Sequence, residues 1–371
     1  MTYGRLVSNV SKIILVAGAR PNFMKLAPVY KGLKERDANV QIIHTGQHYD
    51  HNMSKLFFEE LGIPNPDINL EVGSSSHAVQ TAEVMKSFEK VCLVEKPALV
   101  VVFGDINSTI ACALVARKMN IQVAHVEAGL RSGDMSMPEE INRILTDHIS
   151  NMLFTTSKEA NQNLSKEGID EKNIFFVGNV MIDTLKNQIP SIEKSEIMKK
   201  LGLKTKSFDL LTLHRPSNVD NREKLFSIIS NFDSSDFSFP IVFPAHPRTK
   251  KIISDMDAES FLERIGIEII DPLGYNDFLN LQMNSRSVWT DSGGIQEETT
   301  WLGVPCFTIR ENTERPETIK LGTNTMVKHE EGSNYSAYLG LLDSKKGKRN
   351  IPLWDGKSGQ RIASAIMKNM H

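Results

Sequence analysis

The sequence predicts an α/β protein made of two halves, each built around a parallel, doubly wound sheet. Two observations predict this class. Short β-rich segments alternate with helix-length segments along nearly the whole chain, and several β-rich segments are uniformly apolar, as strands covered on both faces are. The alternation loosens once, in a polar, lysine-rich stretch at 187–208, and then resumes. Two Rossmann-like halves joined in this way leave a cleft between the carboxyl ends of their sheets, where such folds bind ligands.

The first half alternates apolar strand candidates with segments that carry helical spacing. The expected strands are 12–18, 40–46, 98–104, 121–126, 151–157 and 174–178. The expected helices are Met24–Arg36, His51–Leu61, His77–Glu95, Ser108–Lys118 and Glu139–Ser150.

The second half repeats this alternation. Its expected strands are 209–214, 240–246, 267–271, 287–291 and 304–309, with helices between them. The predicted organisation is an N-terminal domain at 1–186, a linker at 187–208, a C-terminal domain at 209–355 and a C-terminal helical segment at 356–371. The last expected helix, Ser358–Lys368, can pack on either domain, and packing back on the first is one of the options.

Composition and charge exclude several classes of protein. The chain has 371 residues, of which 40% are hydrophobic and 24% charged, and its formal net charge is −2. Such a chain is not expected to bind nucleic acid or an anionic membrane non-specifically, and no apolar run approaches the ~20 residues of a membrane span. Its three cysteines lie in apolar runs without metal-site spacing, which indicates buried thiols in a reducing compartment. Because the start lacks a secretory signal, the sequence predicts a cytoplasmic protein.

Polar residues gather where the expected strands end. Glu127, for example, ends the apolar strand at 121–126, and further carboxylates and an arginine follow in the next loop and helical turn. So many polar strand ends in one chain favour a ligand-lined cleft over ordinary loop chemistry. These strand ends are Gly18–Pro21, Thr45–His48, Gly104-Asp105, Glu127, His214–Pro216, Pro244–His246 and Asp291–Gly294.

The segment TDSGGIQEETTWLG (290–303) predicts a phosphate site. Its Ser-Gly-Gly step begins a helix, where unpaired N–H groups and the helix dipole attract an anion. Glu298, about one turn later, is placed to accept hydrogen bonds from a ribose diol. Capping of the helix by Asp291 or Ser292 is the plainer alternative. The cations available for a diphosphate are Arg310 and Arg315, with Arg20, Lys25, His214 and Arg215 at other strand ends.

These motifs together resemble those of the non-hydrolysing UDP-N-acetylglucosamine 2-epimerases. The resemblance runs in order from about residue 12 to 325 and rests on GARPNFMKLAP, TGQH, GDINST, HVEAGLRSGD, PEEINR, HRPSN, PAHP, TDSGGIQEE and RENTERPE. It implies two Rossmann-like domains of the glycosyltransferase-B type with an active-site cleft between them. It also implies interconversion of UDP-GlcNAc and UDP-ManNAc by elimination of UDP to 2-acetamidoglucal, followed by re-addition.

The resemblance assigns roles to individual residues. Asp105, Glu127 and Glu139 are implied as acid–base groups that Arg143 orients, and His214 is implied to stabilise or protonate the departing diphosphate. The remaining implied substrate ligands are Arg20, Lys25, Ser292, Gly293, Gly294 and Arg315 for the phosphates, Glu298 for the ribose, and Leu273 and Phe278 for the uracil. Gln47, His48 and His246 are implied for an allosteric site. The segment at 71–86 lacks the arginine that substrate-activated members use, so this chain is expected to need no activator.

Several alternatives stay open at this stage. The substrate can be a UDP-HexNAc altered at C3 or C6, and a hydrolysing 2-epimerase, a UDP-sugar glycosyltransferase of the same fold and a catalytically silent UDP-sugar sensor are rivals. His44, His48 and His51 straddle a strand end, a turn and a helix start, so no metal site is expected. GxGxxG is absent, so no cofactor is expected. The resemblance also implies a homodimer that works in cell-surface polysaccharide biosynthesis.

Overall fold

The structure is a computed structural model, which describes residues 11–46, 58–233, 236–330, 334–347 and 350–370. The chain forms two compact units. Unit 1 comprises Met1–Thr184 and Pro352–His371, and unit 2 comprises Leu185–Ile351. No helix in the described ranges has the length and apolarity that a membrane span requires.

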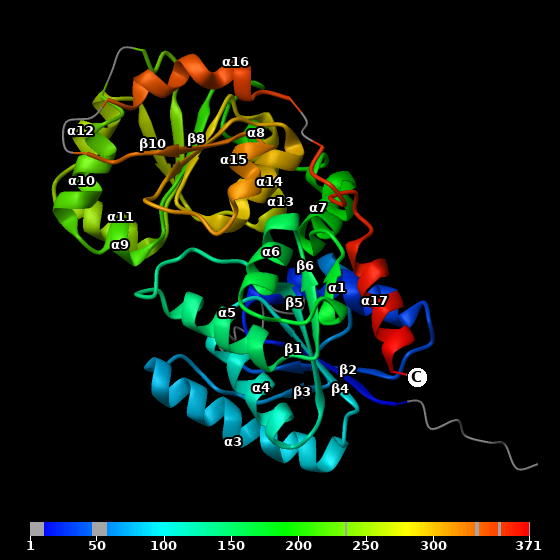
Figure 1. Ribbon diagram of the computed structural model, residues 1–371. Coiled ribbons are helices and arrows are strands. Elements are labelled where there is room, and N and C mark those ends of the chain that lie inside the picture. The colour runs from blue at the N-terminus through cyan, green and yellow to red at the C-terminus, as the bar shows by residue number, and fades with distance from the viewer. Residues whose placement is uncertain (1–10, 47–57, 234–235, 331–333, 348–349, 371) are drawn as a thin grey trace, which may run out of the picture. The chain divides into compact units, whose positions relative to one another are not determined.

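Unit 1 is built on a seven-stranded parallel sheet with the order β3-β2-β1-β4-β5-β6-β7 (Figure 1). The strands are β1 (Ile13–Ala17), β2 (Val40–His44), β3 (Ile68–Asn69), β4 (Leu99–Phe103), β5 (Gln122–Ala128), β6 (Met152–Thr155) and β7 (Ile174–Phe176). The strand order reverses between β1 and β4, which is where open parallel sheets bind ligands.

The helices of unit 1 cover both faces of this sheet. They are α1 (Arg20–Lys34), α3 (His77–Glu95), α4 (Asn107–Lys118), α5 (Pro138–Ile149), α6 (Lys158–Lys166), α17 (Ser358–Asn369), the first part of α7 (Val180–Ile192) and the 3-10 turn η1 (Glu171–Asn173). Apolar residues of α3 and α4, among them Phe88 and Cys112, pack against Ile14, Val16 and Val100 on one face. Of the helix expected at 51–61, only 58–61 lie within the described residues, and these are helical.

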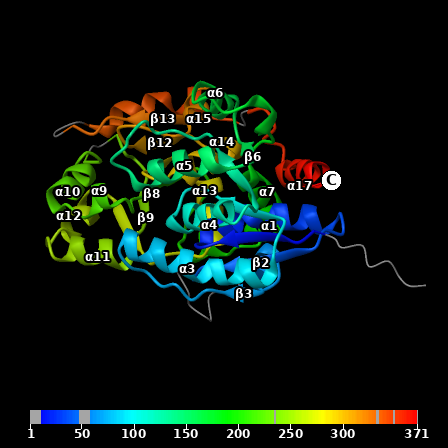
Figure 2. The same cartoon turned by 60° about the horizontal axis from the view of Figure 1, so that its bottom comes forward.

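The last helix, α17, packs against α1, and the two lie side by side in both views (Figures 1 and 2). A Cβ added to Gly359 would lie 2.5 Å from the carbonyl carbon of Pro28, so only glycine permits this close approach. Arg36 of α1 donates to Gln360 at 2.7 Å and to Ser364 at 2.8 Å. The carboxylate of Asp183 accepts the N–H of Gly359 at 2.8 Å. The C-terminal segment is therefore part of unit 1.

Unit 2 is built on a six-stranded parallel sheet with the order β10-β9-β8-β11-β12-β13. The strands are β8 (Asp209–Thr212), β9 (Ile241–Pro244), β10 (Ile267–Ile270), β11 (Val288–Thr290), β12 (Cys306–Ile309) and β13 (Asn324–Val327). Trp289 is fully buried at the centre of an aromatic cluster with Phe232, Phe307 and Tyr335. The helical segments, besides the end of α7, are α8 (Ile197–Lys200), α9 (Pro216–Val219), α10 (Arg222–Ser230), α11 (Pro247–Ser254), α12 (Glu259–Arg264), α13 (Tyr275–Asn284), α14 (Gly293–Leu302), α15 (Pro316–Lys320), α16 (Leu342–Lys345) and η2 (Tyr335–Leu341).

The segment expected as a linker, 187–208, contains regular structure. It holds the last residues of α7 and all of α8, and it lies in unit 2, because the units divide between Thr184 and Leu185. Pro190 lies within α7 without ending it. The second division falls between Ile351 and Pro352, a few residues before the expected boundary at 355.

Candidate functional site

The strand ends of unit 1 bring several predicted residues together. Arg20 and Lys25 lie on the first turns of α1, directly after β1, and the ammonium of Lys25 forms an ion pair with the carboxylate of Glu127. Gly104 follows β4 with φ of 65°. A Cβ added to Gly104 would lie 2.9 Å from the Lys25 Nζ and 3.6 Å from a carboxylate oxygen of Glu127. The ends of β1, β4 and β5 therefore meet at one point.

Glu127 does not end its strand, as the sequence analysis expected. Strand β5 continues to Ala128, and its pairing with β6 shifts register between Val126 and Ala128. Glu127 occupies this bulge with φ of 76°, a left-handed conformation that residues with a side chain seldom adopt. Bulges re-aim a side chain, and strained residues gather at functional sites. The side chain of Glu127 is only 6% exposed.

Asp105, directly after β4, is held by Arg143 of α5. The Arg143 Nε and Nη2 both donate to Asp105 Oδ2, at 2.9 and 2.6 Å. The side-chain amide of Asn142 donates to the Asp105 carbonyl at 2.9 Å. Strands β4 and β5 are neighbours, with Phe103 paired to Val126, so Asp105 and Glu127 leave the sheet side by side.

Two adjacent glutamates of α5 have different surroundings. Glu139 is exposed, whereas Glu140 is buried. Glu140 accepts the N–H groups of Ser132 and Gly133 at 2.9 Å and pairs with Arg143 at 2.7 Å. Glu140 therefore fixes the loop after β5 and orients Arg143, while Glu139 keeps an exposed carboxylate in the first turn of the helix.

In unit 2, Asp291 organises the turn that carries His214. The buried carboxylate of Asp291 accepts the N–H groups of His214 and Arg215, at 3.2 and 3.0 Å, and the Asn218 amide at 3.1 Å. It also lies 2.9 Å from the His214 Nδ1. Burial alone raises the pKa of Asp291, but the hydrogen bonds from His214, Arg215 and Asn218 outweigh it and lower the pKa below its ordinary value. The His214 side chain is 55% exposed.

The start of α14 carries the predicted phosphate motif. Ser292 is the N-cap residue, yet its side chain makes no capping hydrogen bond, and the Asp291 carboxylate is directed to the His214 turn instead. A Cβ added to Gly293 would lie 2.5 Å from an Arg315 guanidinium nitrogen. Arg315 is only 7% exposed and pairs with Glu314 and, at 2.9 Å, with Glu297. Arg315 thus packs directly against the helix start while its charge is shared with two carboxylates.

Glu298 lies buried on α14, with both carboxylate oxygens in hydrogen bonds. Tyr275 donates to one oxygen at 3.2 Å, and Gln282 donates to the other at 2.8 Å. Burial raises the pKa of Glu298 to about 7, although these two donors act in the opposite direction.

The other predicted residues lie apart from these clusters or outside the described ranges. Leu273 and Phe278 are partly buried and pack on the cluster that includes Phe208 and Leu281. His246 is the exposed N-cap residue of α11. Gln47 and His48 lie outside the described residues. Within the described ranges, no group of His, Cys, Asp and Glu is arranged to hold a metal ion.

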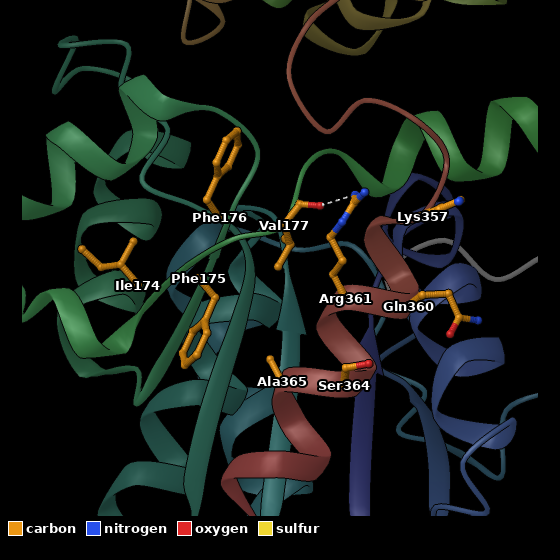
Figure 3. Close-up of a pocket in the computed structure, with 9 residues that line it drawn as sticks. All are labelled: Ile174, Phe175, Phe176, Val177, Lys357, Gln360, Arg361, Ser364 and Ala365. Carbon is orange, nitrogen blue, oxygen red and sulfur yellow. Dashed lines mark hydrogen bonds between the residues drawn. The ribbon is translucent and has the colours of Figure 1, made fainter.

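A cavity of about 650 Å³ lies elsewhere in unit 1, between β7 and α17 (Figure 3). Phe175 and Phe176 line one side, and Lys357 and Arg361 line the other. Arg361 donates to the Val177 carbonyl at 3.1 Å and pairs with Asp355. None of the predicted site residues contributes to this cavity.

Comparison with known proteins identifies the family. A family model described as UDP-N-acetylglucosamine 2-epimerase matches residues 31–367. The chain belongs to this family.

Curated relatives and solved structures agree with this assignment. A UDP-N-acetylglucosamine 2-epimerase homolog of Methanococcus maripaludis is 49% identical, and the match covers 97% of this chain and 100% of that protein. A UDP-2,3-diacetamido-2,3-dideoxy-D-glucuronate 2-epimerase of Pseudomonas aeruginosa is 42% identical over 85% of this chain and 88% of that protein. The crystal structure of Methanocaldococcus jannaschii UDP-GlcNAc 2-epimerase in complex with UDP-GlcNAc and UDP has a TM-score of 0.87 at 44% identity. The match covers 96% of this chain and 99% of the Methanocaldococcus jannaschii chain.

The fold-class prediction is confirmed for both sheets. A glycosyltransferase of Rickettsia africae ESF-5, at 16% identity and a TM-score of 0.54, shares the fold alone. The described residues form a seven-stranded parallel sheet in unit 1 and a six-stranded parallel sheet in unit 2. This is the two-domain, glycosyltransferase-B type architecture of the matched epimerase structure.

The sequence analysis missed the buried partners that hold the predicted residues. His125 and Asp147 are fully buried in unit 1, and Glu140 of unit 1 and Asn218 of unit 2 are almost so. A signal for two of them was present: on a helix, Glu140 and Asp147 lie on the same face as Arg143. No comparable signal marks His125, which lies inside an apolar strand.

Proposed function

We propose that this chain is a non-hydrolysing epimerase that interconverts UDP-GlcNAc and UDP-ManNAc. The reaction eliminates UDP, gives 2-acetamidoglucal, and adds UDP back after protonation at C2 from the other face. Membership of the epimerase family supports this proposal. The observation that carries it is the placement of Glu127, in a strained bulge beside Lys25 and next to Asp105 at the end of the neighbouring strand.

The acid–base groups come from unit 1. Removal of a weakly acidic C2 proton and its return on the opposite face need more than one positioned carboxyl group. We assign these roles to Asp105, Glu127 and Glu139. The paired hydrogen bonds from Arg143 fix Asp105, and the ion pair with Lys25 fixes Glu127.

The nucleotide is held mainly by unit 2. We assign the phosphates to the N–H groups and side chain of the Ser292-Gly293-Gly294 step, where no side-chain cap competes with the anion. Arg20 and Lys25 of unit 1 are further phosphate ligands in this proposal. Arg315 contributes its charge from behind Gly293, since it is buried against the helix start and paired with two glutamates.

The remaining contacts concern the leaving group and the nucleoside. His214, whose Nδ1 lies against Asp291, presents a half-exposed imidazole that is suited to stabilise or protonate the departing diphosphate. Glu298 accepts from the ribose diol, and Leu273 and Phe278 contact the uracil. No metal or redox cofactor takes part in these steps.

A test of the reaction class uses D2O. UDP-GlcNAc incubated with the protein in D2O should gain deuterium at C2 and equilibrate with UDP-ManNAc, which NMR follows directly. Release of free ManNAc, or turnover with retention of the C2 proton, contradicts the proposal.

A second candidate substrate is a UDP-HexNAc altered at C3 or C6. The Pseudomonas aeruginosa relative, which is named for a 2,3-diacetamido glucuronate, favours this possibility. Comparison of kcat/KM for UDP-GlcNAc and for such a modified sugar decides between them.

We propose that the activity does not depend on UDP-GlcNAc bound as an allosteric activator. The segment 71–86 contains no arginine, and its His77 is bound to Asn107 with nitrogen–oxygen separation of 3.3 Å. A second substrate bound at Gln47, His48 and His246 adds a diphosphate that this segment has no guanidinium to balance. We expect UDP-ManNAc alone to be converted without a UDP-GlcNAc primer, at a rate that is hyperbolic in substrate. A reverse reaction that starts only after a trace of UDP-GlcNAc is added overturns this.

The assembly and context follow the family expectation. We propose a cytoplasmic homodimer that supplies UDP-ManNAc for cell-surface polysaccharide. Exposed apolar side chains one turn apart on α5, Ile141 at 40% and Leu145 at 49%, are the kind of surface that self-association covers. Light scattering on the purified protein measures the oligomeric state.

A further inference from the structure

A buried charged cluster lies behind the strand ends of unit 1. It consists of His125 on β5, Asp147 on α5 and Arg131 in the loop after β5. The side chains of His125 and Asp147 are 0% exposed. Burial of ionised groups is costly unless they are paired and hydrogen-bonded, so a cluster of this kind calls for an explanation beyond packing.

Both ring nitrogens of His125 face oxygen acceptors. The Nδ1 lies 2.7 Å from Asp147 Oδ1, and the Nε2 lies 2.8 Å from the carbonyl oxygen of Gly104. A carbonyl oxygen only accepts, so the Nε2 donates to Gly104, while the Nδ1 faces the Asp147 carboxylate. Burial alone raises the pKa of Asp147, but His125 and Arg131 outweigh it and lower the pKa, which keeps the carboxylate ionised.

His125 holds the residue that precedes Asp105. The Gly104 carbonyl accepts from the imidazole, and the Gly104 N–H donates to the Val126 carbonyl at 3.0 Å. The two peptide groups that flank Gly104 are thus both held by hydrogen bonds, and Gly104 has a left-handed conformation with φ of 65°. The direction in which the chain enters Asp105 depends on these two bonds.

Asp147 holds the strand on both sides of Glu127. Asp147 contacts His125, which lies on β5 two residues before Glu127. The Asp147 Oδ2 also accepts the N–H of Gly129, two residues after Glu127, at 3.0 Å. Arg131 adds a third contact to Asp147 at 2.7 Å and a bidentate pair with Glu167. The left-handed backbone of Glu127 is strained and persists only where neighbouring bonds impose it.

We propose that Asp147, acting through His125, is a positioning residue that sets the geometry of Asp105 and Glu127 together. On α5, Asp147 lies one turn after Arg143, which holds Asp105 directly. One rigid helix face therefore fixes both carboxylates relative to each other. This inference rests on the proposed function, since it concerns the acid–base pair of that reaction.

The first test replaces Asp147 with asparagine. Asp147→Asn keeps one acceptor oxygen and replaces the other with an NH2 group, which cannot accept from the donors that the lost oxygen bound, so the strand ends loosen. A displacement of about 1 Å in a reacting group costs on the order of 10²-fold in rate. We expect kcat for C2 deuterium incorporation to fall by about this factor, with KM and calorimetric UDP affinity within about threefold of wild type.

A matched control separates positioning from general damage. Asp183 is also a buried carboxylate of unit 1 that accepts a backbone N–H, but it serves the start of α17. Asp183→Asn should leave kcat per UDP-binding site unchanged. A kcat for Asp147→Asn within about threefold of wild type, or an equal fall in both variants, overturns the inference.

A second pair of variants tests the chain of contacts even if Asp147→Asn does not fold. The amide nitrogen of His125→Gln reaches the position of Nε2 and can still donate to the Gly104 carbonyl. The shorter amide of His125→Asn reaches the position of Nδ1 and serves only Asp147. We expect His125→Gln to retain the larger kcat, and the reverse order overturns the inference. If the wild-type protein does not exchange the C2 proton at all, the proposed function fails instead.

Discussion

At the scale of single residues, Glu127 combines an uncommon backbone with an ion pair. Its φ of 76° directs the carboxylate toward Lys25. The apolar run before Glu127 does not predict the bulge in which it lies. The sequence predicted that the strand ends at Glu127. The structure shows that the strand continues to Ala128. A bulge depends on the pairing of β5 with β6, which is a contact distant in sequence.

Glu127→Gln removes the base and keeps the shape. One positioned acid–base group contributes roughly 10²–10⁴-fold in rate, so we expect a loss in this range with UDP affinity little changed. Initial rates of C2 exchange and calorimetry with UDP measure the two quantities. Glu171→Gln, at an exposed position in the same unit, is the control. Activity within a few-fold of wild type assigns Glu127 a structural role.

Glu298 makes the stability of unit 2 depend on pH. Its pKa is raised from 4.5 to about 7 by burial. The folded state therefore binds more protons than the unfolded state between these values. The resulting stabilisation is complete below pH 4.5 and is lost as the pH rises through about 7. A shift of this size corresponds to about 3 kcal/mol.

Glu298→Gln should abolish this pH dependence. The glutamine can accept from Gln282 and donate to the Tyr275 hydroxyl, so both contacts remain satisfied. Urea unfolding at about pH 5 and about pH 8 should show a smaller difference in the variant than in wild type. Glu268→Gln, exposed on β10, should behave as wild type. An unchanged difference in Glu298→Gln contradicts the assignment.

At the scale of elements, the sequence predicted the central strands and missed two at the sheet edges. Strand β3 has two residues and β13 has four, and neither is a long apolar run. Edge strands are covered on fewer sides, so their sequences carry a weaker apolar signal. The choice between Glu139 and Glu140 shows the same limit. The motif names both, but only packing shows that Glu140 is the one turned inward.

Asp291 joins the end of β11 to the His214 turn, so its replacement should destabilise both of these segments. In the wild type the Asp291 carboxylate accepts from His214, Arg215 and Asn218. In Asp291→Asn, an NH2 group that cannot accept takes the place of one carboxylate oxygen. We expect a loss of about 2–4 kcal/mol in the free energy of unfolding, because a buried, charged hydrogen-bond network is broken. Denaturant titration measures it. Asp255→Asn, which removes an exposed pair with Arg222, should cost less than about 1 kcal/mol.

At the scale of the whole molecule, unit 1 is discontinuous in sequence. The chain leaves it at Thr184 and returns at Pro352. The sequence could show that a last helix exists but not which unit it joins, because the deciding contact is the close approach of Gly359 to Pro28. A glycine in a helix has no side chain, so the sequence pattern does not predict which helix it packs against.

A complementation experiment follows from this discontinuity. A fragment of residues 1–184 lacks α17, which buries Ile362, Ala363 and Ile366. We expect the fragment to lack a cooperative thermal transition and to regain it when a peptide of residues 352–371 is added. The same peptide with Gly359→Ala should fail, since its Cβ meets the Pro28 backbone at 2.5 Å. An identical transition with and without the wild-type peptide contradicts this expectation.

The position of α17 also has a consequence for synthesis on the ribosome. All of Leu185–Ile351 is translated between the two parts of unit 1. At about 5–20 residues per second, the surface of α1 that α17 covers stays open for on the order of ten seconds or more. Throughout that time the nascent chain presents an uncovered apolar face to chaperones and to other nascent chains. A premature stop anywhere in the second half therefore leaves the first half incomplete as well.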